Sequence, residues 1–132
     1  MTEPVEFLDL GDVLNLASRL LGDPPPVRDL GLLASAVARP QTTAFGEDAY
    51  PTIYEKAAAL LQSIVINHAL VDGNKRLGWV STAVFLEING ASVSHVSNQS
   101  VYELVMHIAA DNPDLSEISV ALRKLSESRP EK

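Results

Sequence analysis

Apolar residues recur at helical spacing in six stretches of the chain, and turn signals separate these stretches. After Asp9, an N-cap candidate, apolar residues three and four positions apart run to Leu21, where Gly22 and three prolines end the first helix. The same spacing predicts five further helices, over about residues 29–38, 52–67, 74–88, 98–110 and 114–126. The pattern therefore predicts a mainly helical chain.

The segments between the helices carry other signals. Val5–Leu8 and Ala91–His95 alternate weakly and are expected to form two short strands that pair with each other. The stretch Arg39–Pro51 has no periodicity, and we expect an exposed loop or flap there. Thr52, followed three residues later by Glu55, is a capping-box pattern that opens a strongly apolar helix. From Ser128 onward we expect a frayed tail.

Length and composition narrow the setting. A chain of 132 residues with 46% hydrophobic residues is expected to form a single domain, residues 1–132, around one core. The absence of cysteine excludes disulfides and thiolate metal sites. No apolar run approaches the ~18 residues of a membrane span, and a net charge of -7 disfavours direct nucleic-acid binding. We expect a cytoplasmic protein that binds neither membranes nor nucleic acid.

The densest chemistry in the sequence lies between the third and fourth predicted helices. Within nine residues the chain supplies a titratable base, a carboxylate, a glycine, an amide and two cations. These residues are His68, Asp72, Gly73, Asn74, Lys75 and Arg76. Cations and helix-start amides suit phosphate oxygens, a carboxylate suits Mg²⁺, and an imidazole suits an attacking hydroxyl. The cluster is therefore typical of a triphosphate site.

Each member of the cluster also has a structural interpretation. His68 could cap the preceding helix, Asp72 could be an ordinary turn residue, and Asn74 could be an N-cap as well as a ligand. Lys75 and Arg76 could be solvated, but cations in a first helical turn oppose the helix dipole, which favours an anion there. His95 and His107 stand apart from the cluster, and we interpret them as structural or surface residues.

The segment His68-Ala-Leu-Val-Asp-Gly-Asn-Lys-Arg76 resembles the core motif of the Fic/Doc superfamily, and most closely its Doc (death-on-curing) branch. The Fic motif is His-Pro-Phe-x-Asp/Glu-Gly-Asn-Gly-Arg-x-x-Arg. This chain has Ala69-Leu70 in place of Pro-Phe, Lys75 in place of the second Gly and Trp79 in place of the last Arg. The last two departures are the Doc pattern. Similarity extends from about Arg39-Pro40-Gln41 to Asn89-Gly90, roughly the middle half of the chain.

The resemblance implies an all-α (mainly) fold, a Fic/Doc-type bundle of about six helices with at most a short β pair. It also implies a toxin that is held in check by a Phd-like antitoxin. Doc proteins transfer the γ-phosphate of ATP to a threonine of elongation factor Tu and thereby halt translation. By this resemblance His68 would act on the acceptor hydroxyl, Asp72 would bind Mg²⁺, and residues 73–76 would hold phosphates.

The motif departures bear on which part of ATP is transferred. Lys75 fills space that a glycine would leave for an inner phosphate, and Trp79 cannot clamp a phosphate as an arginine does. A reversed nucleotide that presents its γ-phosphate is therefore expected. Two alternatives stay open. One is a Fic-type AMP transferase that acts on a protein hydroxyl, and the other is a non-catalytic antitoxin-binding or corepressor module.

Overall fold

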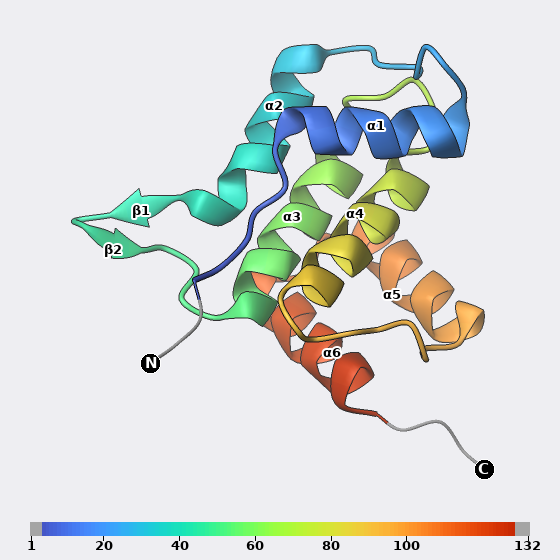
Figure 1. The fold of residues 1–132 in the computed structure, drawn as a ribbon. Helices are drawn as coiled ribbons and strands as arrows, with labels where there is room; N and C mark the ends of the chain where they lie inside the picture. Colours follow the sequence, from blue (N-terminus) through green and yellow to red (C-terminus); the bar gives the residue numbers. More distant parts are fainter. Residues whose placement is uncertain (1–3, 129–132) are drawn as a thin grey trace.

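Six α-helices and a two-stranded hairpin make up the fold in the computed structural model, which describes residues 4–128 (Figure 1). The frayed tail predicted from Ser128 onward falls, except for Ser128 itself, on residues 129–132, which lie outside the described residues; the amide of Ser128 donates to the carbonyl of Lys124. The helices are α1 (Leu10–Leu21), α2 (Leu30–Ala38), α3 (Ile53–Asn67), α4 (Asn74–Ile88), α5 (Asn98–Asp111) and α6 (Leu115–Glu127). A 3₁₀ turn, η1 (Arg39–Gln41), follows α2, and strands β1 (Thr43–Ala44) and β2 (Glu47–Asp48) form the hairpin. The predicted all-α class is confirmed.

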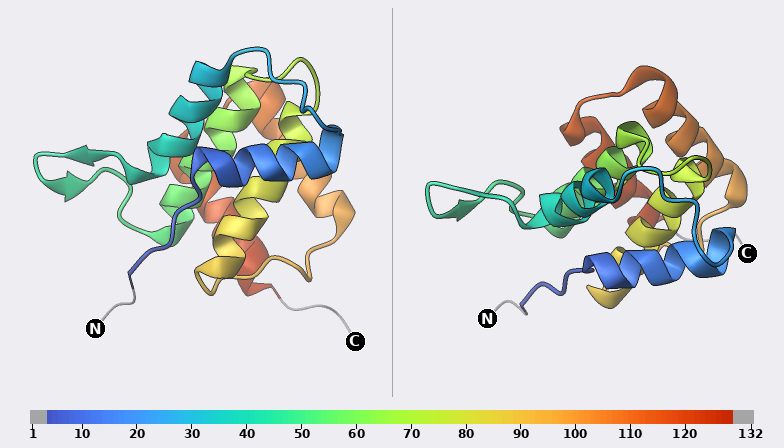
Figure 2. Two further views of the ribbon diagram at one scale, coloured as in Figure 1. Left: turned by 45° about the horizontal axis from the view of Figure 1, so that its top comes forward. Right: turned by 90° about the horizontal axis from the view of Figure 1, so that it is seen from above.

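Helix α3 is the centre of the core. It contacts α2, η1, α4, α5 and α6, and most of its side chains are buried. Helix α4 lies directly beside it, and Gly78 marks the closest approach, since a Cβ there would lie 2.9 Å from Cγ2 of Val65. Helix α1 crosses over the pair on one side, and α5 and α6 cover the other (Figures 1 and 2). The turn between α3 and α4 is therefore held between well-packed elements.

Side chains cap the N-termini of four helices. Asp9, Asp29, Thr52 and Ser97 each accept a hydrogen bond from a first-turn amide. At α1 the capping is reciprocal, because the side chain of Asp12 also accepts from the amide of Asp9 at 2.9 Å. At α3 the expected reciprocal box is incomplete: Thr52 caps the helix, but the Glu55 carboxylate accepts from the Thr52 hydroxyl at 2.9 Å.

The predicted strands at Val5–Leu8 and Ala91–His95 are wrong, because neither segment forms a strand. The N-terminal segment is instead held by one side chain. The Asn89 amide accepts from the backbone N–H of Glu6 at 2.9 Å and donates to its carbonyl at 2.8 Å, which reproduces the hydrogen bonds of a strand pair. The weak alternation of apolar and polar residues in these two short segments therefore accompanies partial burial and not a strand.

The only strands among the described residues lie inside the segment Arg39–Pro51, for which the sequence predicts an exposed loop or flap. Residues 41–49 are all exposed, as expected, but Thr43 pairs with Asp48 and Ala44 with Glu47 in an antiparallel hairpin. The hairpin projects away from the helices in every view (Figures 1 and 2). In the part of the chain that the structure describes, no helix is long and apolar enough to cross a membrane.

Candidate active site

The candidate site is the turn that joins α3 to α4. Helix α3 ends at Asn67, and His68 follows as its C-cap in the left-handed region, with φ 51° and ψ 47°. This conformation is uncommon for a residue other than glycine and favours the end of a helix. The two hydrophobic residues after it, Ala69 and Leu70, are buried, whereas His68 is exposed. The buried pair therefore anchors a turn whose histidine faces solvent.

A second segment, residues 26–29, lies against this turn and fixes its path. The amides of Arg28 and Asp29 donate to the carbonyl of Ala69 at 2.8 and 3.0 Å, and the amide of Val71 donates to the carbonyl of Pro26 at 2.9 Å. The Arg28 guanidinium donates to the carbonyl of His68, from Nε at 3.2 Å and also from Nη2. Sequence reasoning missed Arg28, because nothing in the sequence connects it with a turn 40 residues away.

Asn74 lies inside α4, and its side chain turns back to the residues before the helix. The N-cap of α4 is Gly73, and Asn74 is the first helical residue. Its side chain accepts from the amide of Leu70 and donates to the carbonyl of Leu70, both at 3.0 Å. Of the roles that the sequence leaves open for Asn74, the structure excludes the N-cap, and the role of a ligand stays a prediction. Its side chain closes the turn from within through its two hydrogen bonds to Leu70.

The N-terminus of α4 is left without a side-chain cap, since Gly73 has none to offer. Gly73 takes φ 88°, in the left-handed region, and a Cβ there would lie 2.7 Å from Cδ2 of Leu21 on α1. Only glycine fits both restrictions. First-turn amides have no acceptor within their own helix, and the positive end of the dipole lies here too. Lys75 and Arg76 are exposed in the same turn, so the structure brings together the residues that the sequence predicts for an anion site.

Asp72 is the acidic residue of the turn, and its side chain is exposed. Among residues 4–128 no three His, Asp or Glu side chains gather closely enough to hold a metal ion on their own. Mg²⁺ commonly takes one or two carboxylates together with phosphate oxygens and water. An exposed carboxylate beside an uncapped helix N-terminus fits that donor set, with phosphate completing the coordination.

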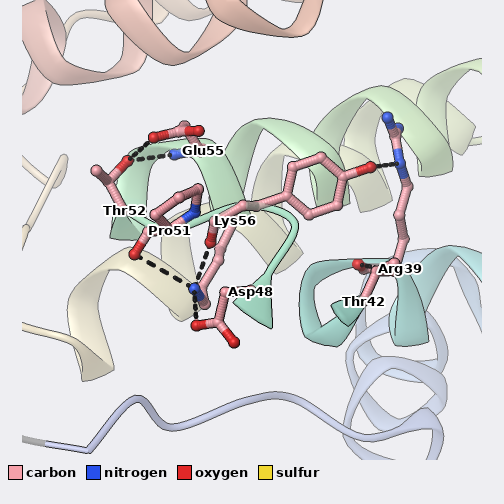
Figure 3. A network of polar contacts seen from close by, with 8 residues as sticks. Arg39, Thr42, Asp48, Pro51, Thr52, Glu55 and Lys56 are labelled. Atoms are coloured by element: carbon pink, nitrogen blue, oxygen red, sulfur yellow. Dashed lines mark hydrogen bonds and ion pairs between the residues drawn. The ribbon is translucent and has the colours of Figure 1, made fainter. Parts of the chain in front are cut away.

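The hairpin, which projects away from the helices (Figures 1 and 2), is anchored at its base. Lys56 on α3 is only 2% exposed, and its ammonium donates to Asp48 at 3.0 Å and to the carbonyls of Tyr50 and Pro51 (Figure 3). Arg39 donates to the Tyr50 hydroxyl at 2.9 Å. The hairpin tip has no such support, and Phe45 there is fully exposed with φ 55°.

Arg39 also ties the hairpin base to the end of α3 that carries the turn. Its guanidinium donates to Gln62 at 2.8 Å and to the hydroxyl of Ser63 at 3.0 Å. A largely polar cavity of about 490 Å³ lies here, with Arg39, Thr42, Ser63 and Asn67 in its wall. Asn67 is the last residue of α3 and directly precedes His68, so one wall of this cavity reaches the helix end before the candidate site.

The other two histidines have structural contacts, as predicted. Nε2 of His95 lies 2.9 Å from the carbonyl oxygen of Leu125 on α6. His107 lies between Glu117 at 2.6 Å and Asp111 at 2.8 Å, and these hydrogen bonds raise the pKa of its imidazole above 6.5. Neither residue lies in the turn between α3 and α4, so His68 is the histidine of the candidate site.

The structure thus shows a helical domain with a projecting hairpin, in which the turn between α3 and α4 carries a histidine, an exposed carboxylate and a helix N-terminus without a side-chain cap. Comparison with known proteins identifies that class: the Fic/DOC family matches over residues 7–86, and the chain belongs to this family. A relative, Toxin Doc of Mycolicibacterium smegmatis (strain ATCC 700084 / mc(2)155), is 48% identical over 118 residues, which cover 89% of this chain and 91% of the relative. Together with Lys75 and Trp79, this similarity places the chain in the Doc branch.

Proposed function

We propose that this protein is a Doc-type toxin that transfers the γ-phosphate of ATP to a threonine of elongation factor Tu. The observation that carries the proposal is the N-terminus of α4, which Gly73 leaves uncapped and Lys75 and Arg76 make cationic. His68 and Asp72 belong to the same turn. The relative named Toxin Doc supports the biological role, since its similarity covers nearly the whole chain.

In the proposed step the threonine oxygen forms a bond to the γ-phosphorus, and the bond between that phosphorus and the β–γ bridging oxygen breaks. His68 orients the threonine hydroxyl and accepts its proton, and ADP leaves. The amides of the first α4 turn, with Lys75 and Arg76, stabilise charge on the transferred phosphoryl group, which is the main catalytic task in phosphoryl transfer. Asp72 would hold Mg²⁺, which neutralises phosphate charge when bound.

Two side chains favour phosphate transfer over AMP transfer. Lys75 is an exposed side chain where the Fic motif has glycine, so it occupies space beside the amides that an inner phosphate would need. Trp79 stands where the Fic motif has its last arginine and offers no charge to an outer phosphate. These differences support a nucleotide that enters with its γ-phosphate at the start of α4.

The target is proposed to dock on the hairpin as an extended segment. The exposed strands β1 and β2 are two residues each and leave backbone groups for a third strand. The anchors at Lys56 and Arg39 fix the hairpin base, and the cavity that begins beside Thr42 extends to Asn67, the residue before His68. An acceptor side chain laid along this cavity would approach the imidazole.

A Phd-like antitoxin is the proposed partner. A protein able to stop translation would harm its own cell when free, and the relative is itself named a toxin. Large apolar side chains such as Leu30, Val71 and Tyr102 are exposed in this chain and give a partner segment surface to cover. With a net charge of -7, basic residues on the antitoxin would accelerate association. Co-expression with the neighbouring reading frame and gel filtration would detect the complex.

The proposed activity is tested by incubating purified protein, Mg²⁺ and elongation factor Tu with ATP labelled at either the α- or the γ-phosphate. Label transferred from the γ-position alone, and a matching phosphate adduct in the intact mass, are expected. Label from the α-position would establish an AMP transferase instead. No adduct from a folded protein that still binds an antitoxin would favour the non-catalytic binding module.

A further inference from the structure

The polar cavity at the base of the hairpin, which we call the Arg39 cavity, is lined by α2, η1 and α3. Its volume is about 490 Å³, and its wall includes Ser35, Arg39, Thr42, Ser63 and Asn67. Arg39 is the charged residue of this wall, and the other polar side chains are neutral hydroxyl and carboxamide groups. The cavity therefore presents one cation among neutral polar groups.

Neutral groups also hold the guanidinium of Arg39 in place. Its Nε donates to the Tyr50 hydroxyl at 2.9 Å (Figure 3), and its Nη1 donates to Gln62 at 2.8 Å and to Ser63 at 3.0 Å. Gln62 is itself fixed, because its Nε2 donates to the carbonyl of Pro113 at 3.0 Å. The orientation of the guanidinium is therefore set before any ligand arrives, which lowers the cost of binding.

The charge of Arg39 is not matched within the fold. Among residues 4–128 no carboxylate lies within 4.0 Å of its guanidinium, and its Nη2 has no hydrogen-bond acceptor. The side chain is partly buried, and cations in such positions are usually paired with an acidic group. Hydrogen bonds from a guanidinium to a carboxylate are among the strongest in proteins. The unused edge of Arg39 is therefore open to an anion.

We propose that the Arg39 cavity binds the carboxylate of an acidic side chain on the protein segment that docks along the hairpin. This inference rests on the proposed function and adds to it the chemistry that selects the target. One guanidinium balances the single charge of a carboxylate, whereas a phosphate group would keep part of its charge without a cation. The wall reaches from Thr42, next to β1, to Asn67, the residue before His68. A segment that joins the hairpin and presents its acceptor to His68 would therefore lie over the cavity.

Ser35 offers a test that leaves the anchors of the hairpin intact. Replacing Arg39 would also remove its bonds to Tyr50 and Gln62, so a loss of activity would have two explanations. Ser35 is exposed on α2, four residues before Arg39, and residues four apart are neighbours on a helix surface. Ser35→Glu therefore brings a carboxylate to Arg39 from within the chain and fills the site. Ser116→Glu, at an exposed serine in the first turn of α6, is the control for added charge.

Carboxylate binding is measured first without any transfer reaction. Acetate is titrated into ¹⁵N-labelled protein at an ionic strength held constant with chloride, and the Nε–Hε resonance of Arg39 is followed by NMR. This resonance is assigned from its absence in Arg39→Lys. We expect a saturable shift in the wild type and in Ser116→Glu. Ser35→Glu should show no such shift, because its own carboxylate occupies the guanidinium.

Recognition of the target is measured by transfer of labelled γ-phosphate to elongation factor Tu. Ser35→Glu should raise the KM for elongation factor Tu about tenfold, as for loss of a hydrogen bond to a charged group, while kcat and the KM for ATP stay the same. Acidic residues of elongation factor Tu near its acceptor are then replaced by their amides, one at a time. One replacement should raise the KM of the wild type and have little further effect in Ser35→Glu, because both changes remove the same contact.

The outcomes separate this inference from the proposed function. If phosphate is transferred but Ser35→Glu and Ser116→Glu have the same KM for elongation factor Tu, only this inference falls. An Arg39 resonance that moves equally with acetate and with chloride, or equally in the wild type and Ser35→Glu, also overturns it. If elongation factor Tu is never modified while acetate binds at Arg39, the proposed function falls, whereas the assignment of the cavity to a carboxylate stands.

Discussion

Helices α3 and α4 are both 15 residues long and pack side by side, but their N-termini are completed in opposite ways. Thr52 caps α3 by accepting from the amide of Glu55 at 3.1 Å, and its hydroxyl is bonded to the Glu55 carboxylate as well. Gly73 begins α4 with no side chain at all, and two cations follow it. The N-terminus of α3 therefore has its side-chain cap within the fold, whereas the N-terminus of α4 has no side-chain cap and is open to an anion.

The same contrast separates the histidines. The imidazole of His107 has a carboxylate on each side, from α5 and from α6, so its hydrogen-bonding capacity is used in holding two helices together. His68 is held by its backbone, through the Arg28 guanidinium on its carbonyl, and its side chain is exposed. Groups that the fold satisfies contribute to stability, whereas groups that it positions but leaves free are candidates for function. Each prediction below tests one side of this division.

The largest expected effect follows from replacing His68. Asn tolerates the left-handed backbone better than most residues, so His68→Asn should keep φ near 51° while removing the proton acceptor. Loss of general-base help lowers the transfer rate by about 10²–10⁴. The rate is measured with γ-labelled ATP, and circular dichroism verifies the fold. His107→Asn is the control and should keep the rate. Full activity in a folded His68→Asn protein would remove His68 from the mechanism.

The second effect concerns the uncapped end itself. Gly73→Ala forces a Cβ into the left-handed region, at about 1–2 kcal/mol, and against Leu21. Gly90→Ala is the matched control, because Gly90 has a similar φ of 81° but nothing within 4 Å of its Cβ position. In urea unfolding, backbone strain should lower the free energy of unfolding of both variants by a similar amount. Gly73→Ala should lose a further amount because of its contact with Leu21. Calorimetry should show weakened ATP binding for Gly73→Ala alone; equal binding by the two variants would argue against an anion site there.

Much of this division could be predicted from the sequence, because its strongest signals are local. The six helices follow from apolar spacing and caps, and the candidate residues follow from one nine-residue motif. What could not be predicted depends on contacts between distant segments. An N-cap was one role left open for Asn74, because its residue type favours that position, but Gly73 is the N-cap and the Asn74 side chain is hydrogen-bonded to Leu70.

The flap shows the same limit. Polar residues with no periodicity predicted an exposed loop or flap over residues 39–51. In the structure Lys56 and Arg39 fix the ends of this segment, and a hairpin with two residues in each strand forms between them. Such short strands carry too few residues for alternation to be recognised. The clamp from Arg28 likewise needs the fold to bring it to His68. Long-range polar contacts of this kind leave no pattern in a single sequence.

A smaller and purely structural effect is expected at the capped end. Thr52→Ala removes the side-chain oxygen that accepts from the amide of Glu55, and loss of such a cap costs about 0.5–2 kcal/mol of unfolding free energy. Thr52→Ser keeps the oxygen and should keep most of the stability in the same urea titration. Neither variant should change the transfer rate per folded molecule. A rate loss in Thr52→Ala would show that the two helix ends are not functionally separate.

The smallest expected effect is the pH dependence of the clamp between α5 and α6. The imidazole of His107 donates hydrogen bonds to the carboxylates of Glu117 and Asp111, and these bonds, that to Glu117 first, raise its pKa above the ordinary 6.5. The folded protein therefore binds a proton at His107 more tightly than the unfolded chain does. The resulting stabilisation is fully present below pH 6.5, and it disappears as the pH rises through the folded pKa of His107. Because the imidazole is exposed, the gain is small. His107→Gln should therefore lower the Tm slightly at pH 6 and not at pH 9. A Tm difference for His107→Gln that is as large at pH 9 as at pH 6 would mean that packing, and not the charged pair, joins the two helices.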